Sequence, residues 1–235
     1  MNKEEFKRLL EEKQISINEQ QYDLFEKYFS ILIEYNEKTN LTSLTEKSEV
    51  YLKHFYDSLT ILAEYHLKPS ASLCDVGAGA GFPSVPIKIL RPDLNITIVD
   101  SLGKRIDFLN YLFNCLNLTG IKAIHSRAEE FVVENRETYD YVTARAVARL
   151  NLLSELCIPL VKLGGEFIAL KATTGLEELN EAKEAITVLG CKQKEMINFN
   201  LPLGGGERTI IVLEKVKNTP NKYPRNYGQM KKKPL

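Results

Sequence analysis

The chain has 235 residues and carries 31 basic and 31 acidic side chains, which gives a formal net charge of zero. This length suits one domain of ordinary size, and 44% apolar with 26% charged residues is typical of a globular protein. The neutral balance argues against a dedicated nucleic-acid-binding protein, and the lack of a long apolar run or a signal-like start predicts a cytoplasmic protein without a membrane span.

The first part of the chain is expected to be helical. Apolar and aromatic side chains recur there at helical spacing, and Asn18 is a plausible N-cap. His54, with Asp57 one turn later, is interpreted as a structural histidine rather than a ligand. Residues 1–66 are therefore predicted to form a helical extension packed on the core. The expected helices span residues 3–12, 19–37 and 47–64.

From Ser72 onward, strands and helices alternate, which favours a mostly parallel sheet with helices on both faces. The last two strands have only a short loop between them and must form an antiparallel hairpin. This α/β arrangement, a seven-stranded sheet in a core of residues 67–217, resembles the Rossmann-like class I methyltransferase fold. The expected strands are 73–76, 95–100, 121–125, 139–143, 165–171, 192–200 and 208–216. The expected helices are one opened by Pro83 and Pro86, then 105–116, 150–163 with an interruption near Pro159, and 177–189.

A glycine turn follows the first of these strands, at Gly77, Gly79 and Gly81. Glycine between a strand and a helix lets the backbone approach a ligand closely. The G-x-G-x-G spacing differs from the G-x-G-x-x-G of dinucleotide sites, and Asp75 stands two residues ahead of it. An acid is unsuited to a pyrophosphate but suits the ammonium and sulfonium of S-adenosylmethionine, which is the cofactor we expect.

Two further polar positions follow the next strands. Asp100 ends the second strand, where an acid can accept hydrogen bonds from both ribose hydroxyls of an adenosine, and Ser101 comes next. A polar loop at residues 126–130 follows the third strand and includes Ala128 and Glu129. Because the carboxyl ends of parallel strands meet at one edge, these positions predict an adenosine pocket.

The sequence offers no convincing general base. The segment 143–146 lacks the Pro-Pro motif of enzymes that methylate exocyclic amines. The four cysteines have no metal-ligand spacing and are interpreted as buried free thiols, so no metal is expected, and Cys157 is retained only as a minor alternative nucleophile. Chemistry without a base, such as methylation of guanine N7, would be supported by proximity and orientation alone.

The end of the chain is basic. From Lys215 to Leu235 it contains lysines and an arginine but no acid, so residues 218–235 are predicted to be either a tail that contacts a polyanion or a solvated end. Arg145 and Lys171 follow the fourth and fifth strands and should face the same crevice. The alternative is that Lys171 caps a strand and Arg145 pairs with an internal acid. The residues predicted to contact RNA are Lys171, Arg225, Lys231, Lys232 and Lys233.

Several motifs over nearly the whole length resemble the ribosomal RNA small subunit methyltransferase G family, also called glucose-inhibited division protein B. The segments that carry the resemblance are Asn40-Leu-Thr, His54-Phe-Tyr-Asp-Ser-Leu59, Asp75 to Pro83, Asp100-Ser-Leu-Gly-Lys-Arg105, Ser126-Arg-Ala-Glu129, Ala144-Arg-Ala146, Gly164 to Lys171 and Tyr223-Pro-Arg225. Ser84 stands where the family often has glycine.

The resemblance implies N7 methylation of one guanosine in the decoding-region loop of bacterial 16S rRNA. It also implies cofactor contacts at Gly77, Phe82, Ala128, Glu129 and Arg145, to which Gly79, Asp100 and Ser101 are added from the strand pattern. Arg145 is the one candidate for orienting the substrate in catalysis. We expect a monomer that acts on 16S rRNA or the small ribosomal subunit. A methyltransferase of another RNA, protein or small molecule, a nicotinamide-dependent oxidoreductase and a non-catalytic RNA-binding module are the alternatives.

Overall fold

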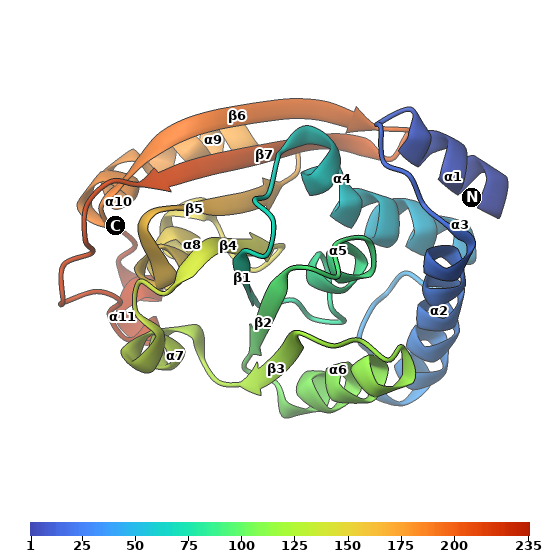
Figure 1. Ribbon diagram of the computed structural model, residues 1–235. Coiled ribbons are helices and arrows are strands. Elements are labelled where there is room, and N and C mark those ends of the chain that lie inside the picture. The colour runs from blue at the N-terminus through green and yellow to red at the C-terminus, as the bar shows by residue number, and fades with distance from the viewer.

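A seven-stranded sheet with the order β3-β2-β1-β4-β5-β7-β6 organises the computed structural model, which describes residues 1–235 (Figure 1). Only β7 runs antiparallel to its neighbours, β5 and β6. The predicted mostly parallel sheet with a C-terminal hairpin is thereby confirmed, since the short link 202–205 cannot accommodate a crossover. The strands are β1 (Ser72–Val76), β2 (Asn95–Asp100), β3 (Ile121–His125), β4 (Tyr139–Arg145), β5 (Val161–Lys171), β6 (Cys191–Leu201) and β7 (Gly206–Lys215).

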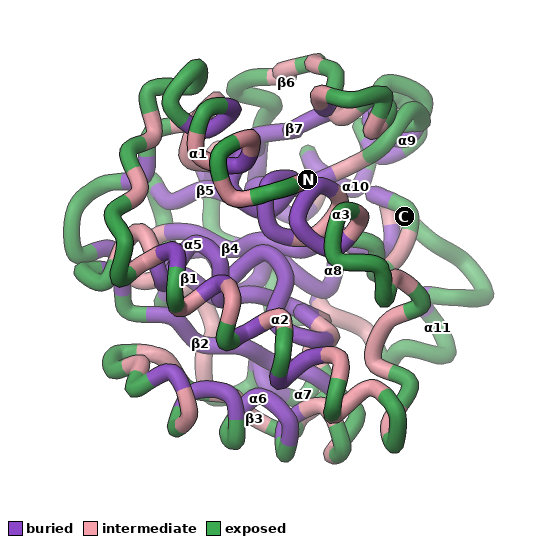
Figure 2. Tube along the Cα trace, turned by 90° about the vertical axis from the view of Figure 1, so that its right-hand side faces the viewer, coloured by how far each residue is buried: buried purple, intermediate pink, exposed green.

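Helices cover both faces of this sheet, and successive strand residues point to opposite faces. Leu73 of β1 joins a core that includes the N-terminal helices, whereas the adjacent Cys74 joins the core beneath α8 and α10. Figure 2 shows the inner strands buried and the outer turns of the helices exposed. The helices are α1 (Lys3–Glu11), α2 (Glu19–Thr39), α3 (Lys47–Val50), α4 (Asp57–Glu64), α5 (Ser84–Leu90), α6 (Gly103–Cys115), α7 (Ala128–Asn135), α8 (Leu150–Cys157), α9 (Gly175–Glu181), α10 (Lys183–Val188) and α11 (Tyr227–Lys232).

The N-terminal helices share one hydrophobic core with the sheet. Phe6, Phe25 and Phe55 come from three separate helical segments, and each has an exposed fraction of 0%. Asn18 caps α2 through the reciprocal pair of hydrogen bonds with Gln21 that its position predicted. Every helix of the protein is too short or too polar to traverse a lipid bilayer.

Three local predictions were wrong in part. The helix expected at 150–163 with an interruption near Pro159 ends at Cys157, because Pro159 lies in a following 3-10 turn and β5 begins at Val161. The loop expected at 126–130 continues into α7, whose first turn holds Glu129 and Glu130, where acids favour a helix. The helix expected at 47–64 is confirmed at both ends, and a π-helical segment, Tyr51–Tyr56, joins α3 to α4 within it. The helix expected at 177–189 divides into α9 and α10, and the break falls at Ala182.

Candidate functional site

A cavity of about 540 Å³ lies at the carboxyl ends of β1 to β4, where the strand order reverses between β1 and β4. Such a switch point is where open α/β sheets bind ligands, and the volume is typical of a small-molecule site. The structure brings together there every residue predicted to contact the cofactor. They are Gly77, Gly79, Phe82, Asp100, Ser101, Ala128, Glu129 and Arg145.

The glycine turn has a backbone that only glycine adopts easily. Gly77 and Gly79 have φ angles of +76° and +60°. A Cβ on Gly77 would lie 2.7 Å from Cγ2 of Val147, which also lines the cavity. A Cβ on Gly79 would meet no protein atom within 4 Å. The turn therefore presents bare backbone to an open space, which is what a closely approaching ligand requires.

Asp75 does not lie where its position suggested. Its side chain is fully buried behind the turn and is absent from the cavity wall. Oδ2 accepts a hydrogen bond from the Ser84 hydroxyl, and Oδ1 has no partner. Burial raises the pKa of Asp75 to about 7, against the lowering effect of the Ser84 hydrogen bond and the Arg145 charge. The hydroxyl of Ser84, at a position where glycine was expected to be common, is thus a partner for this buried acid.

Asp100 is fixed at the end of β2 by three donors. Its Oδ2 accepts from the Gly79 N–H at 3.2 Å and from Arg105 Nη1 at 3.0 Å, while Oδ1 accepts from the Leu102 N–H at 3.0 Å. The side chain is 2% exposed and lines the cavity. Two carboxylate oxygens can together accept about four hydrogen bonds, so acceptor capacity remains for a ligand.

A stacked cluster forms the wall between β1 and β4. The His54 ring lies 4.3 Å from the Phe82 ring at an interplanar angle of 15°, and the Arg145 guanidinium carbon lies 5.2 Å from the same ring. Arg145 donates to His54 Nδ1 at 3.1 Å, to Asp57 Oδ2 at 3.2 Å and to the Lys53 carbonyl at 3.2 Å. The guanidinium is therefore held in one orientation by acceptors on the N-terminal helices.

His54 is neutral in this cluster. Burial, followed by the charge of Arg145, lowers the pKa of the imidazole to about 3. Since a guanidinium can only donate, His54 Nδ1 must accept, and the ring proton sits on Nε2, which is 2.9 Å from Thr42 Oγ1. Both ring nitrogens of His54 have partners within the protein, as expected of a structural histidine, and the fixed neutral ring also lines the cavity.

A second cavity, of about 620 Å³, adjoins the first and shares four of its residues, His54, Arg145, Ala146 and Val147. Its other walls include the apolar side chains of Leu170, Phe199 and Ile210. Arg208, which forms an ion pair with Asp57 at 2.9 Å, also contributes. Two cavities that adjoin at common lining residues can hold two molecules between which a group is transferred.

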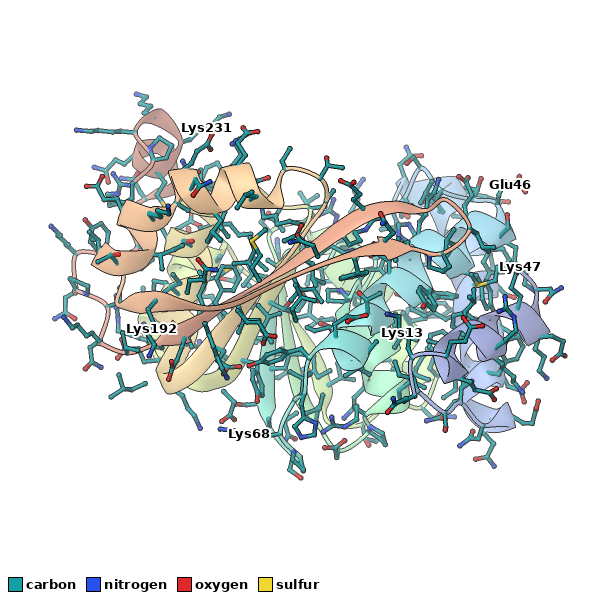
Figure 3. All side chains as sticks on the ribbon, turned by 90° about the horizontal axis from the view of Figure 1, so that it is seen from above. Lys13, Glu46, Lys47, Lys68, Lys192 and Lys231 are labelled. Carbon is teal, nitrogen blue, oxygen red and sulfur yellow. The ribbon has the colours of Figure 1, made fainter.

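Two of the basic residues predicted to contact RNA have internal partners. Lys171 lines the second cavity, but its ammonium lies 2.7 Å from Glu178 and is 8% exposed. Arg225 pairs with buried Glu155 at 2.6 Å. Lys231, Lys232 and Lys233 are exposed and form no ion pair, and Figure 3 shows Lys231 at the edge of the molecule. Contact with RNA stays a prediction for all five.

The cysteines offer no nucleophile to the site. Cys157 is fully buried, and burial raises the pKa of its thiol well above the ordinary value. Neither Cys157 nor any other cysteine lines either cavity. A protonated thiol without access to substrate is inert. No group of three or more His, Cys, Asp or Glu side chains is placed to hold a metal ion.

Sequence reasoning missed several residues of the two cavities, among them three with informative contacts. Arg105 lies in the Asp100-to-Arg105 motif, so its pairing with Asp100 was within reach of the sequence. Arg208 lies on β7, and its approach to Asp57 depends on packing across the molecule. Tyr227 lines the first cavity although it lies in the predicted tail, and no sequence signal placed it there.

Comparison with known proteins gives consistent matches over the full length. A family model described as GidB, rRNA small subunit methyltransferase G, matches residues 21–210. Proteins named ribosomal RNA small subunit methyltransferase G are similar to the chain in Lysinibacillus sphaericus (52% identity, 100% of both chains) and in a strain of Bacillus cereus (54%, 100% of this chain and 99% of the relative). The relative in Staphylococcus carnosus is 53% identical over 96% of this chain and 95% of its own.

Solved structures are similar in fold. An S-adenosylmethionine-dependent methyltransferase from Aquifex aeolicus has a TM-score of 0.55 at 17% identity, covering 76% of this chain and 98% of its own. A 16S rRNA adenine methyltransferase from Catenulisporales acidiphilia has a TM-score of 0.53 at 11% identity, covering 71% and 91%. At these identities, the likeness shows a shared Rossmann-like methyltransferase fold.

Proposed function

Since the chain belongs to the GidB family of rRNA small subunit methyltransferases G, we propose that it uses S-adenosylmethionine to methylate guanine N7 in 16S rRNA. The protein is a methyltransferase of small-subunit ribosomal RNA. A ribosomal substrate supports a location in the bacterial cytoplasm. We further propose that the protein acts as a monomer.

The single observation that supports transfer chemistry is the shared wall of the two cavities. His54 and Arg145 face both, so a donor in the first and a base in the second would meet at this wall. Phe82 and His54 present stacked rings there, and the Asp57 carboxylate holds the guanidinium of Arg145. Orientation by such fixed groups can supply much of the rate for a reaction between two bound molecules.

The first cavity fits S-adenosylmethionine. The open space beside Gly79 and the bare turn at Gly77 suit its amino-acid portion, and Asp100 is placed to accept from the ribose hydroxyls. The cofactor supplies a methyl group already activated on a cationic sulfur. Arg145, whose three hydrogen bonds fix it between the cavities, would orient the accepting base.

The titration behaviour of the site supports an acceptor that loses no proton. His54 has a pKa of about 3 and donates its only proton to Thr42, and its Nδ1 lone pair is engaged by Arg145. Asp75, whose pKa is about 7, is buried behind the turn and lines neither cavity. Guanine N7 carries a free lone pair, so its methylation needs no general base.

Contacts to the RNA phosphates are proposed for the exposed lysines at 231–233. They carry charge at the rim of the molecule and have no acidic partner. Lys171 and Arg225 are weaker candidates, because each would have to leave an ion pair with a nearly buried carboxylate. Lys171 remains close enough to the second cavity to influence the electrostatic potential felt by a bound base.

The deciding experiment maps N7-methylguanosine in 16S rRNA from a strain that lacks the gene. We expect one N7-methylguanosine to disappear and to return when the wild-type gene is restored, but not when an Arg145→Ala gene is supplied. Purified protein with radiolabelled S-adenosylmethionine should then label small subunits or naked 16S rRNA from the deletion strain, and RNA from the parent strain much less. Label at another atom of the base would contradict the N7 assignment, and no difference between the strains would contradict the rRNA substrate.

A further inference from the structure

The C-terminal segment reaches the cofactor cavity. Tyr227, the first residue of α11, lines the 540 Å³ cavity beside Arg127, Ala128 and Glu129. Its ring lies 5.1 Å from the guanidinium carbon of Arg127, whose Nε donates to Glu129 at 2.7 Å. Figure 1 shows α11 next to α7, and α11 also contacts α8. A segment predicted to be an RNA-binding or solvated tail therefore forms part of the wall of a ligand cavity.

A buried ion pair holds this segment in place. Arg225 donates from Nε to Glu155 Oε1 at 2.9 Å and from Nη2 to Oε2 at 2.6 Å, and its backbone N–H donates to Oε1 at 2.8 Å. The Glu155 side chain, on α8, is only 1% exposed. Tyr223 and Met230, which precede and follow Arg225 in the sequence, are also buried. Because an unpaired carboxylate at Glu155 would be costly, the ion pair anchors α11 against α8.

The two cavities determine which end of a bound cofactor would face Tyr227. The reactive methyl must lie at the wall that both cavities share, which Arg145 marks on the β4 side. With the ribose at Asp100 on β2, the purine must extend the other way, past the end of β3. Ala128 and Tyr227 line the cavity at that end.

We propose that Tyr227 is a cofactor-binding residue that covers the purine of S-adenosylmethionine, and that the Arg225–Glu155 ion pair is what positions it. This inference rests on the proposed cofactor. Tyr227 is 37% exposed, and its hydroxyl forms no hydrogen bond within the protein. A purine against the ring would cover apolar surface that is otherwise in water. Arg225 is then a positioning residue rather than an RNA contact.

Calorimetric titration with S-adenosylmethionine and with adenosine tests the proposal. Tyr227→Ala should raise the dissociation constant of both ligands by a similar factor of about ten, which corresponds to about 1.4 kcal/mol. Tyr227→Phe should bind like the wild type, because the ring and not the hydroxyl makes the contact. Tyr111→Ala is the matched control, since Tyr111 on α6 is 48% exposed and lies outside the cavity.

The role of the ion pair is tested by Arg225→Ala and by the double variant with Tyr227→Ala. Arg225→Ala should weaken both ligands about as much as Tyr227→Ala, and the double variant should be no weaker than either single variant. Circular dichroism and a thermal melt will check that each variant is folded. If Arg225→Ala does not fold, Tyr227→Ala alone still tests the role of the ring.

Three results separate this inference from the proposed function. A wild type that binds no S-adenosylmethionine would overturn the proposed function itself. A wild type that binds it and a Tyr227→Ala variant with unchanged affinity for both ligands would overturn only the role of Tyr227. A Tyr227→Ala variant that keeps its cofactor affinity but has a higher KM for RNA would also overturn it, and would assign the segment to the RNA.

Discussion

Gly77 allows a sharp test of the cofactor turn, because two separate effects oppose any side chain there. Its φ of +76° lies in the left-handed region, which costs an L-residue roughly 1–2 kcal/mol. In addition, a Cβ would lie 2.7 Å from Cγ2 of Val147. Gly79 has a similar φ of +60°, but its Cβ would meet no atom within 4 Å. The two glycines therefore separate backbone strain from steric overlap.

We expect Gly79→Ala to lower the free energy of unfolding of the cofactor-free protein by roughly 1–2 kcal/mol, and Gly77→Ala to lower it by more. In a chain of this size, each kcal/mol lowers Tm by roughly 2–4 °C. Adding Val147→Ala to Gly77→Ala removes the overlap, so the remaining loss should match that of Gly79→Ala once the cost of Val147→Ala alone is subtracted. Denaturant unfolding of the four variants measures each quantity.

Calorimetry on the same variants extends the test to the ligand. Gly77→Val should abolish binding of S-adenosylmethionine while the protein stays folded, because the turn would be displaced from the cavity that Val147 also lines. Equal destabilisation by Gly77→Ala and Gly79→Ala would refute the steric part of the reasoning. Unchanged cofactor affinity in folded Gly77→Val would remove Gly77 from the cofactor site.

Four further outcomes are expected. Asp100→Ala should weaken S-adenosylmethionine binding about tenfold to a hundredfold, since leaving the buried ribose hydroxyls unpaired costs roughly 1–3 kcal/mol. In calorimetry the variant should also lose any preference for adenosine over dideoxyadenosine. A preference that persists would place the ribose elsewhere. Burial raises the pKa of Asp75 to about 7, so the folded protein favours the protonated carboxyl. The free energy of unfolding is therefore highest below about pH 4 with respect to this group, and it falls as the pH rises to about 7. In denaturant titrations, the free energy of unfolding of Asp75→Asn should therefore rise relative to that of the wild type by on the order of 2 kcal/mol between about pH 5 and pH 8. A difference between the two proteins that does not change with pH would contradict this. Because His54 is neutral, with a pKa of about 3, the single-turnover rate at saturating RNA should be nearly flat between about pH 6 and pH 8. Since Asp75 itself titrates near pH 7, a one-proton slope would reveal an overlooked general base only if it persists in Asp75→Asn. Alanine at 231–233 should make RNA binding less salt-dependent, by roughly 0.7–0.9 in the log–log slope for each phosphate that is no longer neutralised, and an unchanged slope would mean that these lysines are only solvated.

The order of the elements could be predicted from the sequence because it depends on local patterns. Alternating apolar runs and helical periodicity, with a short last connection, were sufficient for a parallel sheet closed by a hairpin. The glycine turn and Asp100 were predicted to lie together because the carboxyl ends of adjacent parallel strands share one edge. The family resemblance, carried by motifs such as Asp100 to Arg105, was confirmed by the match over residues 21–210.

Boundaries that depend on competing local signals were less predictable. The helix predicted for residues 150–163 was expected to be interrupted near Pro159, but the structure ends it for good at Cys157 and starts β5 at Val161. The acids at Glu129 and Glu130 were interpreted as loop polarity, although the buried Phe131 and Val132 that follow them anchor α7. In both cases the deciding factor was which side chains could be buried against the sheet.

The partners of the charged residues were decided only by the tertiary structure. Lys171 meets Glu178, Arg225 meets Glu155, and Lys215, which begins the acid-free basic run of the sequence, is buried beside Glu137. Net charge and composition describe how many charges a segment carries, but not which acid the fold brings within hydrogen-bond distance. Except for Lys171 and Glu178, these partners lie far apart in the sequence.

The same reason accounts for the site residues that sequence patterns placed elsewhere. The stacking of His54 on Phe82 joins the N-terminal helices to the glycine turn, and Tyr227 arrives at the cavity from the far end of the chain. The strand order determines where a ligand can bind, and this follows from local periodicity. The walls of that site, however, come from whichever distant segments are buried against the strand ends, because burial and charge pairing depend on packing over the whole chain.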